Sequence, residues 1–271
     1  MSTPPTVPSR LRREPPAFRR VSVMSVTPLT PRMVRVTVAG PDLSGLMIEQ
    51  PAASVRLLLP PSGTKEIVMP AWNGNEFLLP DGARPAIRTL TPLRLDPEAT
   101  ALDVEIVVHE GGAASAWARA AEKGDEAAIS GPGRGYPVDP DAALFLLAGD
   151  ESALPAIGQL LEALPAGKPV RVMIEVANPD ARLDLPTRAG AGTDIQWFDL
   201  PAGAAPGEAL VAAVVEAAAD LPAGARVWAA GEAAAVQRIR RHLLDERGLP
   251  RSETWLRGYW KHGRTGDADD D

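Results

Sequence analysis

The spacing of apolar residues changes near Pro140, and this change limits the folds open to the chain more than any other feature. In 32–39 the valines fall at every second position, which indicates a half-buried strand. In 142–147 the apolar run is continuous, and in the segment that follows leucine and isoleucine recur at helical spacing. A continuous apolar strand that feeds a helix is typical of a parallel sheet. The sequence therefore predicts two unlike domains joined near 137–141.

The expected fold class is β + α/β. Six short strands separated by turn-rich sequence predict an antiparallel six-stranded barrel in the first half; they are expected at 18–26, 32–39, 54–59, 87–93, 102–109 and 127–130. A parallel-sheet lobe is predicted in the second half, where strands alternate with helices. Its strands are expected at 142–147, 170–176, 195–199 and 226–230, and its later helices at 207–219 and 232–247.

Four regions follow from this pattern and from the ends of the chain. The arginines and prolines of 1–17 bury little, so this stretch is expected to be a mobile arm. The barrel domain is expected at 18–138 and the α/β domain at 139–264. The aspartate-rich residues 265–271 are expected to form a solvated tail.

Composition excludes several classes of function. The formal net charge of −7 disfavours binding to nucleic acid or to an anionic membrane. The chain has no cysteine, which excludes disulfides, thiolate metal sites and iron–sulfur clusters, and its histidines lack metal-ligand spacing. No apolar run reaches the roughly 18 residues that span a bilayer. We expect a cytoplasmic monomer with no membrane insertion and no protein-bound metal, whose redox chemistry would need an organic cofactor.

Several short motifs follow one another in a distinctive order. The barrel half carries Arg88-Thr89-Leu90-Thr91, then a run from His109 through Gly111-Gly112-Ala113-Ala114-Ser115 to Trp117, then Gly131-Pro132-Gly133-Arg134-Gly135. The second half carries Gly149-Asp150-Glu151-Ser152, Ala230-Gly231-Glu232 and Gly258-Tyr259-Trp260. From about Phe18 to Gly263 the chain resembles the siderophore-interacting proteins, FAD-dependent ferric-siderophore reductases of the ferredoxin reductase superfamily.

The resemblance implies an FAD site in the barrel. It assigns the arginine of the first motif to a phosphate and the final hydroxyl to the reactive edge of the flavin, while the tyrosine of the family is Leu90 here. Small residues at the start of a helix bring free amides close to a pyrophosphate, although a plain glycine turn is the alternative. Trp117 is either a cofactor contact or a core anchor, and His109 is expected to have a positioning role. The expected FAD contacts are Arg88, Thr89, Leu90, Thr91, His109, Gly112, Ala113, Ala114, Ser115 and Trp117.

The resemblance also implies a nicotinamide site, for NADPH or NADH. Ligands bind at the carboxyl ends of strands in open α/β sheets, where the glycine and acidic motifs of the second half fall. Two carboxylates there would repel a pyrophosphate unless turned aside, and a turn that caps the next helix through Ser152 is the alternative. Arg182 and Arg188 slightly favour NADPH, whereas Glu175 and Asp180 leave NADH open. The expected contacts are Gly149, Asp150, Glu151, Gly231, Glu232, Tyr259 and Trp260, the last two alternatively sealing the seam between the domains.

A ferric siderophore is the substrate that the resemblance implies. Because such complexes are often anionic, the flavin edge should be framed by cations, for which Arg56, Arg134, Arg257 and Lys261 are the candidates. The expected reaction is hydride transfer to FAD and then one-electron transfer to iron, with no side chain acting as acid or nucleophile. The alternatives are a general flavin reductase, an electron carrier to a protein partner, and a flavin-binding module whose activity has decayed.

Overall fold

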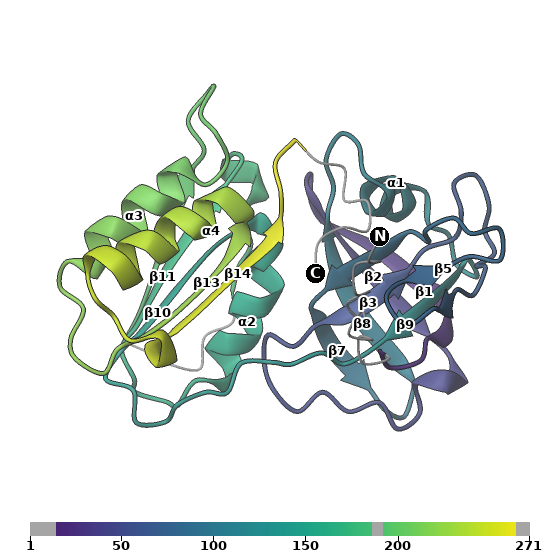
Figure 1. The fold of residues 1–271 in the computed structure, drawn as a ribbon, viewed down its shortest axis with the longest axis horizontal. Helices are drawn as coiled ribbons and strands as arrows, with labels where there is room; N and C mark the ends of the chain where they lie inside the picture. The colour runs from purple at the N-terminus through teal and green to yellow at the C-terminus, as the bar shows by residue number, and fades with distance from the viewer. Residues whose placement is uncertain (1–14, 186–191, 264–271) are drawn as a thin grey trace, which may run out of the picture.

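The computed structural model describes residues 15–185 and 192–263, which form two halves side by side (Figure 1). One half is built on an antiparallel sheet and the other on a parallel sheet. Most of the predicted N-terminal arm, the predicted acidic tail and Arg188 lie outside the described residues. The predicted fold class is confirmed.

The barrel half is a strongly curled sheet with the strand order β6-β3-β9-β1-β2-β8-β7, in which all neighbours are antiparallel. A short hairpin and one helix complete it. The strands are β1 (Arg19–Thr30), β2 (Met33–Ala39), β3 (Val55–Leu58), β6 (Ile87–Leu90), β7 (Pro92–Asp96), β8 (Ala101–Val107) and β9 (Glu126–Ser130); the hairpin is β4 (Ala71–Trp72) and β5 (Phe77–Leu78), and the helix is α1 (Ala113–Ala120).

This sheet has seven strands in the described residues, because the single strand expected at 87–93 is divided at Thr91. The two pieces, β6 and β7, follow each other in the chain but lie at opposite ends of the strand order. The chain therefore crosses from one edge of the sheet to the other at Thr91, which requires the sheet to curl. Pro92 begins β7, a position that an edge strand tolerates because proline has no N–H to donate.

The alternation of β2 explains how the barrel is filled. Val36 and Val38 are fully buried among apolar side chains of β1, β3, β8 and β9, while Thr37 and Arg35 point to the other face. Arg35 pairs there with Glu105 and Thr37 donates to Asp103, so the polar residues of this face are satisfied. The regular strands leave the loops at the ends of the barrel to carry the motifs.

The α/β half is a five-stranded parallel sheet with the order β12-β11-β10-β13-β14. Helix α2 packs on one face, and α3 and α4 pack on the other (Figure 1). The strands are β10 (Phe145–Asp150), β11 (Val170–Val176), β12 (Thr193–Asp199), β13 (Arg226–Glu232) and β14 (Thr254–Trp260); the helices are α2 (Leu154–Ala163), α3 (Glu208–Ala218) and α4 (Ala233–Arg240), which continues as the π-helical turn η5 (Arg241–Glu246). The strand order reverses between β10 and β13, which makes their carboxyl ends the switch point where such sheets bind ligands.

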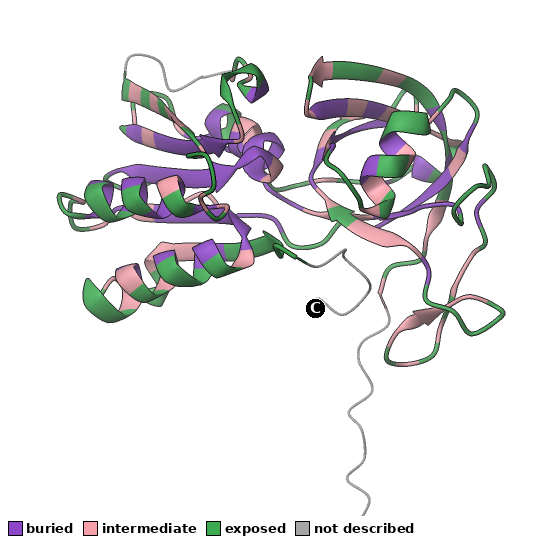
Figure 2. Ribbon diagram, turned by 90° about the horizontal axis from the view of Figure 1, so that it is seen from above, coloured by how far each residue is buried: buried purple, intermediate pink, exposed green. Residues whose placement is uncertain are grey.

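The two halves share one apolar core. Met33, Ala52 and Tyr136 from the barrel side belong to the same buried cluster as Leu154 and Ile157 from the start of α2, and Figure 2 shows the buried strands of both halves. Gln159 of α2 reinforces this seam, because it donates to the Pro92 carbonyl at 2.6 Å and accepts from the Ala52 amide at 2.9 Å. Within 15–185 and 192–263, no helix combines the length and the apolar character needed to cross a membrane.

Candidate functional site

The first part of the candidate site is the start of α1. Gly111 and Gly112 have φ of 88° and 84°, the left-handed region that glycine adopts without strain. Gly112 provides no side-chain cap, so the amides of the first turn have no partner within the helix. A Cβ added to Gly111 would meet no atom within 4 Å, so the approach is open. These are the features that a pyrophosphate needs.

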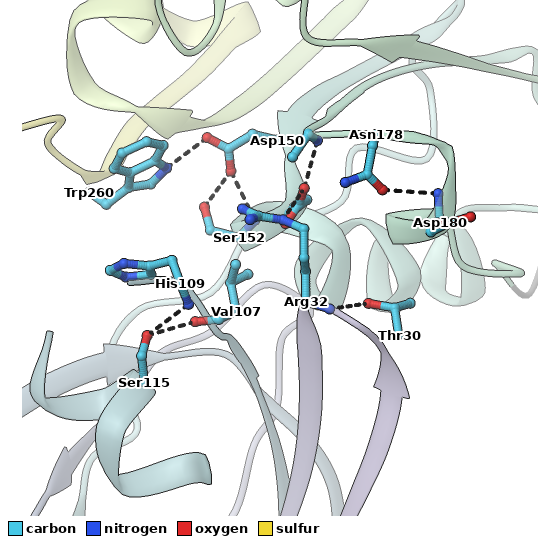
Figure 3. Close-up of polar contacts among 12 residues, drawn as sticks. Thr30, Arg32, Val107, His109, Ser115, Asp150, Ser152, Asn178, Asp180 and Trp260 are labelled. Carbon is cyan, nitrogen blue, oxygen red and sulfur yellow. Dashed lines mark hydrogen bonds and ion pairs between the residues drawn. The ribbon is translucent and has the colours of Figure 1, made fainter. Parts of the chain in front are cut away.

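Ser115 holds this helix against the end of β8. Its hydroxyl donates to the Val107 carbonyl and accepts from the His109 amide, both at 3.3 Å (Figure 3). Ser115 is 2% exposed, and its hydroxyl faces the protein. His109 is exposed, and its ring lies beside Gly112. The structure thus gives Ser115 and His109 parts in shaping the loop before α1.

A second group of predicted residues gathers at the β6 edge of the barrel. Thr89 is exposed and lies opposite Arg56 of β3, which lies opposite Ser130 of β9 on its other side. The Gly133 amide donates to the Ser54 carbonyl at 2.7 Å, which brings the exposed Arg134 to the start of β3. Two predicted cations, Arg56 and Arg134, are therefore brought near Thr89.

The remaining residues of the first motif point in different directions. Arg88 is partly buried and donates to the Ile87 carbonyl at 2.8 Å. Leu90 packs partly against the barrel core. Thr91 is 7% exposed, and its side chain lies beside that of Tyr259, which comes from the other half.

At the switch point, Asp150 is a hub of hydrogen bonds. Its buried carboxylate accepts from the Ser152 amide at 2.9 Å and the Ser152 hydroxyl at 2.5 Å on one oxygen. The other oxygen accepts from the Glu232 amide at 2.8 Å. It also accepts from the Trp260 indole at 2.7 Å (Figure 3). Burial raises the pKa of Asp150, although these bonds oppose the shift. One side chain thus ties together β10, β13 and β14.

The other two acids of the switch point are also directed into the protein. Glu151 lies 2.8 Å from Nε of Arg32 in the β1–β2 turn and accepts from the Ala177 amide at 2.7 Å. Glu232 caps α4 through the Ala235 amide at 2.8 Å and accepts from the His262 amide at 3.1 Å. The carboxylates are therefore turned aside, as binding of a pyrophosphate would require.

The two glycines of the switch point have internal partners. The space that a Cβ would take at Gly149 is filled by Ala153, and at Gly231 an added Cβ would lie 2.6 Å from Oδ2 of Asp150. The absence of a side chain there lets neighbouring protein atoms pack closely. A ligand at this edge would therefore lie above these glycines and meet the surrounding loops.

Tyr259 and Trp260 end β14 between the two halves. They are 39% and 38% exposed. Burial of the Tyr259 hydroxyl raises the pKa of this residue to about 12. The ring of Tyr259 makes an edge contact with Trp228. Because Trp260 donates to Asp150 and Tyr259 lies beside Thr91, the end of β14 bridges the switch point and the β6–β7 crossing.

Three predicted residues lie apart from these groups. Trp117 packs against the barrel core, and its indole nitrogen is buried without a partner in the described residues. Arg257 lies over the ring of Trp255 at 5.0 Å and lines a hollow of about 160 Å³ with Arg240 and Arg251. Lys261 is exposed beyond β14.

Sequence reasoning missed residues whose importance depends on distant contacts. Arg32 meets Glu151 across a separation of 119 residues, and no local signal marks it. Asp199 ends β12 and pairs with Arg182. Its place at the carboxyl end of a predicted strand of the parallel sheet is the signal that could have drawn attention to it.

The comparisons with known proteins agree with this geometry. The family description "Siderophore-interacting FAD-binding domain" matches residues 22–136, and "Siderophore-interacting protein" matches 142–263. A siderophore utilization protein from T. fusca has a similar structure, with a TM-score of 0.80, 36% identity, and coverage of 94% of this chain and 97% of its own.

Two curated relatives have names that describe an activity. The ferric vibriobactin reductase of Vibrio cholerae is 28% identical over 240 residues, which is 87% of this chain and 86% of the relative. The NADPH-dependent ferric-chelate reductase of Escherichia coli is 32% identical over 175 residues, 60% of this chain and 63% of the relative. Phthalate dioxygenase reductase, at 14% identity with a TM-score of 0.59 over 92% of this chain and 70% of its own, shares the fold.

A curled antiparallel sheet followed by a doubly wound parallel sheet defines this molecule as a protein of the ferredoxin reductase-like fold. Within that class, the chain belongs to the siderophore-interacting protein family and carries that family's FAD-binding domain. The predicted family is confirmed.

Proposed function

We propose that this protein is a flavin-dependent reductase that moves electrons from NAD(P)H through FAD to siderophore-bound ferric iron. The observation that carries the proposal is the meeting of the two halves at the end of β14. Tyr259 lies beside Thr91 of the barrel, and Trp260 donates a hydrogen bond to Asp150 at the switch point. A flavin in the barrel and a dinucleotide on the parallel sheet would share this junction.

The described residues fit FAD. The open start of α1, with uncapped amides and room above Gly111, suits the pyrophosphate. Thr89 is exposed on β6, and Thr91 lies where the chain crosses between the two edges of the barrel sheet. We propose Arg88, Thr89, Leu90, Thr91 and residues 112–115 as the residues that hold it, with His109 shaping the loop.

FAD, when bound, supplies the chemistry that side chains lack: it takes a hydride from NAD(P)H with a proton from solvent, and returns two electrons singly to two ferric ions while releasing two protons. The chain's own residues would orient and enclose the two cofactors. The hydrogen bond from its indole to Asp150 fixes Trp260 at the junction, where Tyr259 lies beside Thr91. No side chain is needed as a general acid or nucleophile.

The proposed substrate is an anionic ferric siderophore at a cationic rim. Arg56 and Arg134 are on the β6 side of the barrel, and Arg257 and Lys261 are on or beyond β14. Favourable charges at a mouth raise the local concentration of an anionic substrate. We propose the first pair as the principal contacts, because they lie nearer to Thr89. Action as a cytoplasmic monomer is part of the same proposal.

An anaerobic absorption titration tests the function. Flavin-loaded protein should bleach when NADH or NADPH is added and regain its colour when a ferric trihydroxamate is added, with ferrous iron captured by a chromogenic chelator. Failure to bleach would contradict the nicotinamide step. Bleaching with reoxidation by cytochrome c but not by ferric siderophores would favour an electron carrier instead.

Arg134→Gln tests the cationic rim. We expect KM for an anionic ferric siderophore to rise by about threefold to tenfold, with the rate of flavin reduction unchanged, because one favourable surface charge is lost. Arg238→Gln, which removes an exposed arginine from α4, is the matched control. Equal effects of both variants would show that net charge, and not the rim, matters.

A further inference from the structure

The carboxyl ends of β11 and β12 form an acidic patch beside the switch point. In a doubly wound sheet, the adenosine ribose of a dinucleotide lies at this side, where an acid recognises the 2′-hydroxyl or an arginine accommodates a 2′-phosphate. Residues 177–185 and 199–206, which follow these two strands, contain three acids and one cation. The acids are Asp180, Asp184 and Asp199, and the cation is Arg182.

Arg182 is already held by an acid. Its Nη2 lies 2.8 and 2.9 Å from the two carboxylate oxygens of Asp199, the last residue of β12. The pair joins the loop after β11 to the end of β12, since Asp199 is in register with Val176. Within the described parts of these two loops, Arg182 is the arginine that could accept a 2′-phosphate, and it is neutralised by a neighbour that a phosphate would have to displace.

Glu175 adds a buried negative charge at the same edge. It is 3% exposed near the end of β11, and its two oxygens accept from the Gly207 amide at 2.6 Å and the Leu210 amide at 3.0 Å. Because both oxygens cap α3, this acid does not reach a ribose. Its carboxylate belongs to the cap of α3, and the inference rests on the Arg182–Asp199 pair.

We infer that the protein uses NADH in preference to NADPH, and that Asp199 is the residue that sets this preference by occupying Arg182 and repelling a 2′-phosphate. The inference rests on the proposed function, of which it names the electron donor. It reverses the slight preference for NADPH that Arg182 and Arg188 indicate in the sequence, of which Arg188 lies outside the described residues. It also sets this chain apart from the Escherichia coli relative, whose name specifies NADPH.

The size of the preference for NADH depends on the partial exposure of the Arg182–Asp199 pair. The side chains of Arg182 and Asp199 are 39% and 42% exposed, so solvent weakens both the ion pair and the repulsion. A dianionic phosphate beside a carboxylate at this depth should lower kcat/KM for NADPH about tenfold relative to NADH. The nicotinamide, pyrophosphate and adenine are common to both donors, so the comparison isolates the 2′ position.

The first test compares kcat/KM for flavin reduction by NADH and by NADPH. The wild-type protein should prefer NADH about tenfold, and Asp199→Asn should shift the ratio toward NADPH by about fivefold to tenfold, because Arg182 is released while the side-chain shape is kept. Asp194→Asn is the matched control, since it removes one carboxylate from the opposite end of β12. Adding Arg182→Ala to Asp199→Asn should abolish the gain.

The second test measures binding without flavin chemistry. Adenosine 5′-monophosphate should bind the wild-type protein more tightly than adenosine 2′,5′-bisphosphate, and Asp199→Asn should narrow the difference. Tighter binding of the bisphosphate to wild type, or binding of neither compound, would overturn the inference. Reduction by neither dinucleotide would contradict the proposed function, while the binding experiment would still decide the preference at this site.

Discussion

A single carboxylate, Asp150, connects three strands of the α/β half. A change of one atom in this carboxylate should therefore weaken contacts in all three strands. In Asp150→Asn, the amide can accept on one side only, and either Ser152 or the Trp260 and Glu232 donors would face an N–H. We expect the free energy of unfolding at pH 7 to fall by about 2 kcal/mol. Urea unfolding of the wild type and of Asp150→Asn measures this difference in the free energy of unfolding.

The same residue predicts a pH dependence with a definite sign. Because burial raises the pKa of folded Asp150 above its ordinary value of 3.8, the folded protein binds a proton more tightly than the unfolded chain. Asp150 therefore contributes stability at low pH that is lost as the pH rises from 3.8 through the folded-state pKa. The stability difference between the wild type and Asp150→Asn should shrink over that range and then stay constant.

Asp194→Asn is the control for both measurements, because this exposed carboxylate carries the same charge. Its effect should stay within about 0.5 kcal/mol. A stability difference that grows with rising pH would show that the folded-state pKa of Asp150 is not raised.

At the scale of elements, local pattern located most strands but not their partners. The predicted 170–176 coincides with β11, since β-branched residues recur at every second position of this segment. β14 was missed, because this edge strand leaves its last four residues exposed and has no regular alternation. The prediction of one continuous strand at 87–93 was wrong, because the segment is divided between β6 and β7. Pro92 was the signal that could have predicted this division.

Helix α3 shows how one element depends on another. Glu175 of β11 caps its start by accepting from the Gly207 and Leu210 amides. Glu175→Gln should lower the free energy of unfolding by about 1–2 kcal/mol, because a neutral amide accepts at one atom only and loses the attraction of a charge to the helix dipole. Thermal and urea unfolding would measure the loss.

Glu208→Gln provides the matched control for this cap. Glu208 lies in the same first turn but is exposed, so the substitution removes a charge near the helix dipole without removing the cap. We expect a loss of no more than about 0.5 kcal/mol. Equal losses in the two variants would assign the effect to the dipole alone.

At the scale of the whole molecule, the candidate site depends on contacts between residues that are far apart in the sequence and meet where the two halves join. The loop before α1 could be predicted because its glycines and Ser115 are close in sequence. The contact of Trp260 with Asp150 spans 110 residues, and that of Arg32 with Glu151 spans 119. Periodicity gives the type of an element but not its neighbour, so sequence alone could not place these pairs.

The Arg32–Glu151 pair lets the coupling of the halves be tested. Glu151 is 6% exposed, so Arg32→Met leaves a buried carboxylate with the Ala177 amide as its remaining partner. We expect the free energy of unfolding to fall by about 2 kcal/mol, because an unpaired buried charge is unfavourable. The wild-type protein should unfold in one transition, since one apolar core spans the seam. The variant should show two, followed by tryptophan fluorescence and circular dichroism.

Arg35→Met distinguishes coupling from general destabilisation. Arg35 and Glu105 form an equally close pair, at 2.6 Å with a similarly buried carboxylate, but both residues belong to the barrel. Loss of this pair should lower stability by a comparable amount while the transition stays single, because no contact between the halves is removed. If Arg32→Met also kept one transition, the shared core around Met33 and Leu154 would be sufficient to couple the halves, and the ion pair would serve only to turn Glu151 away from the switch point.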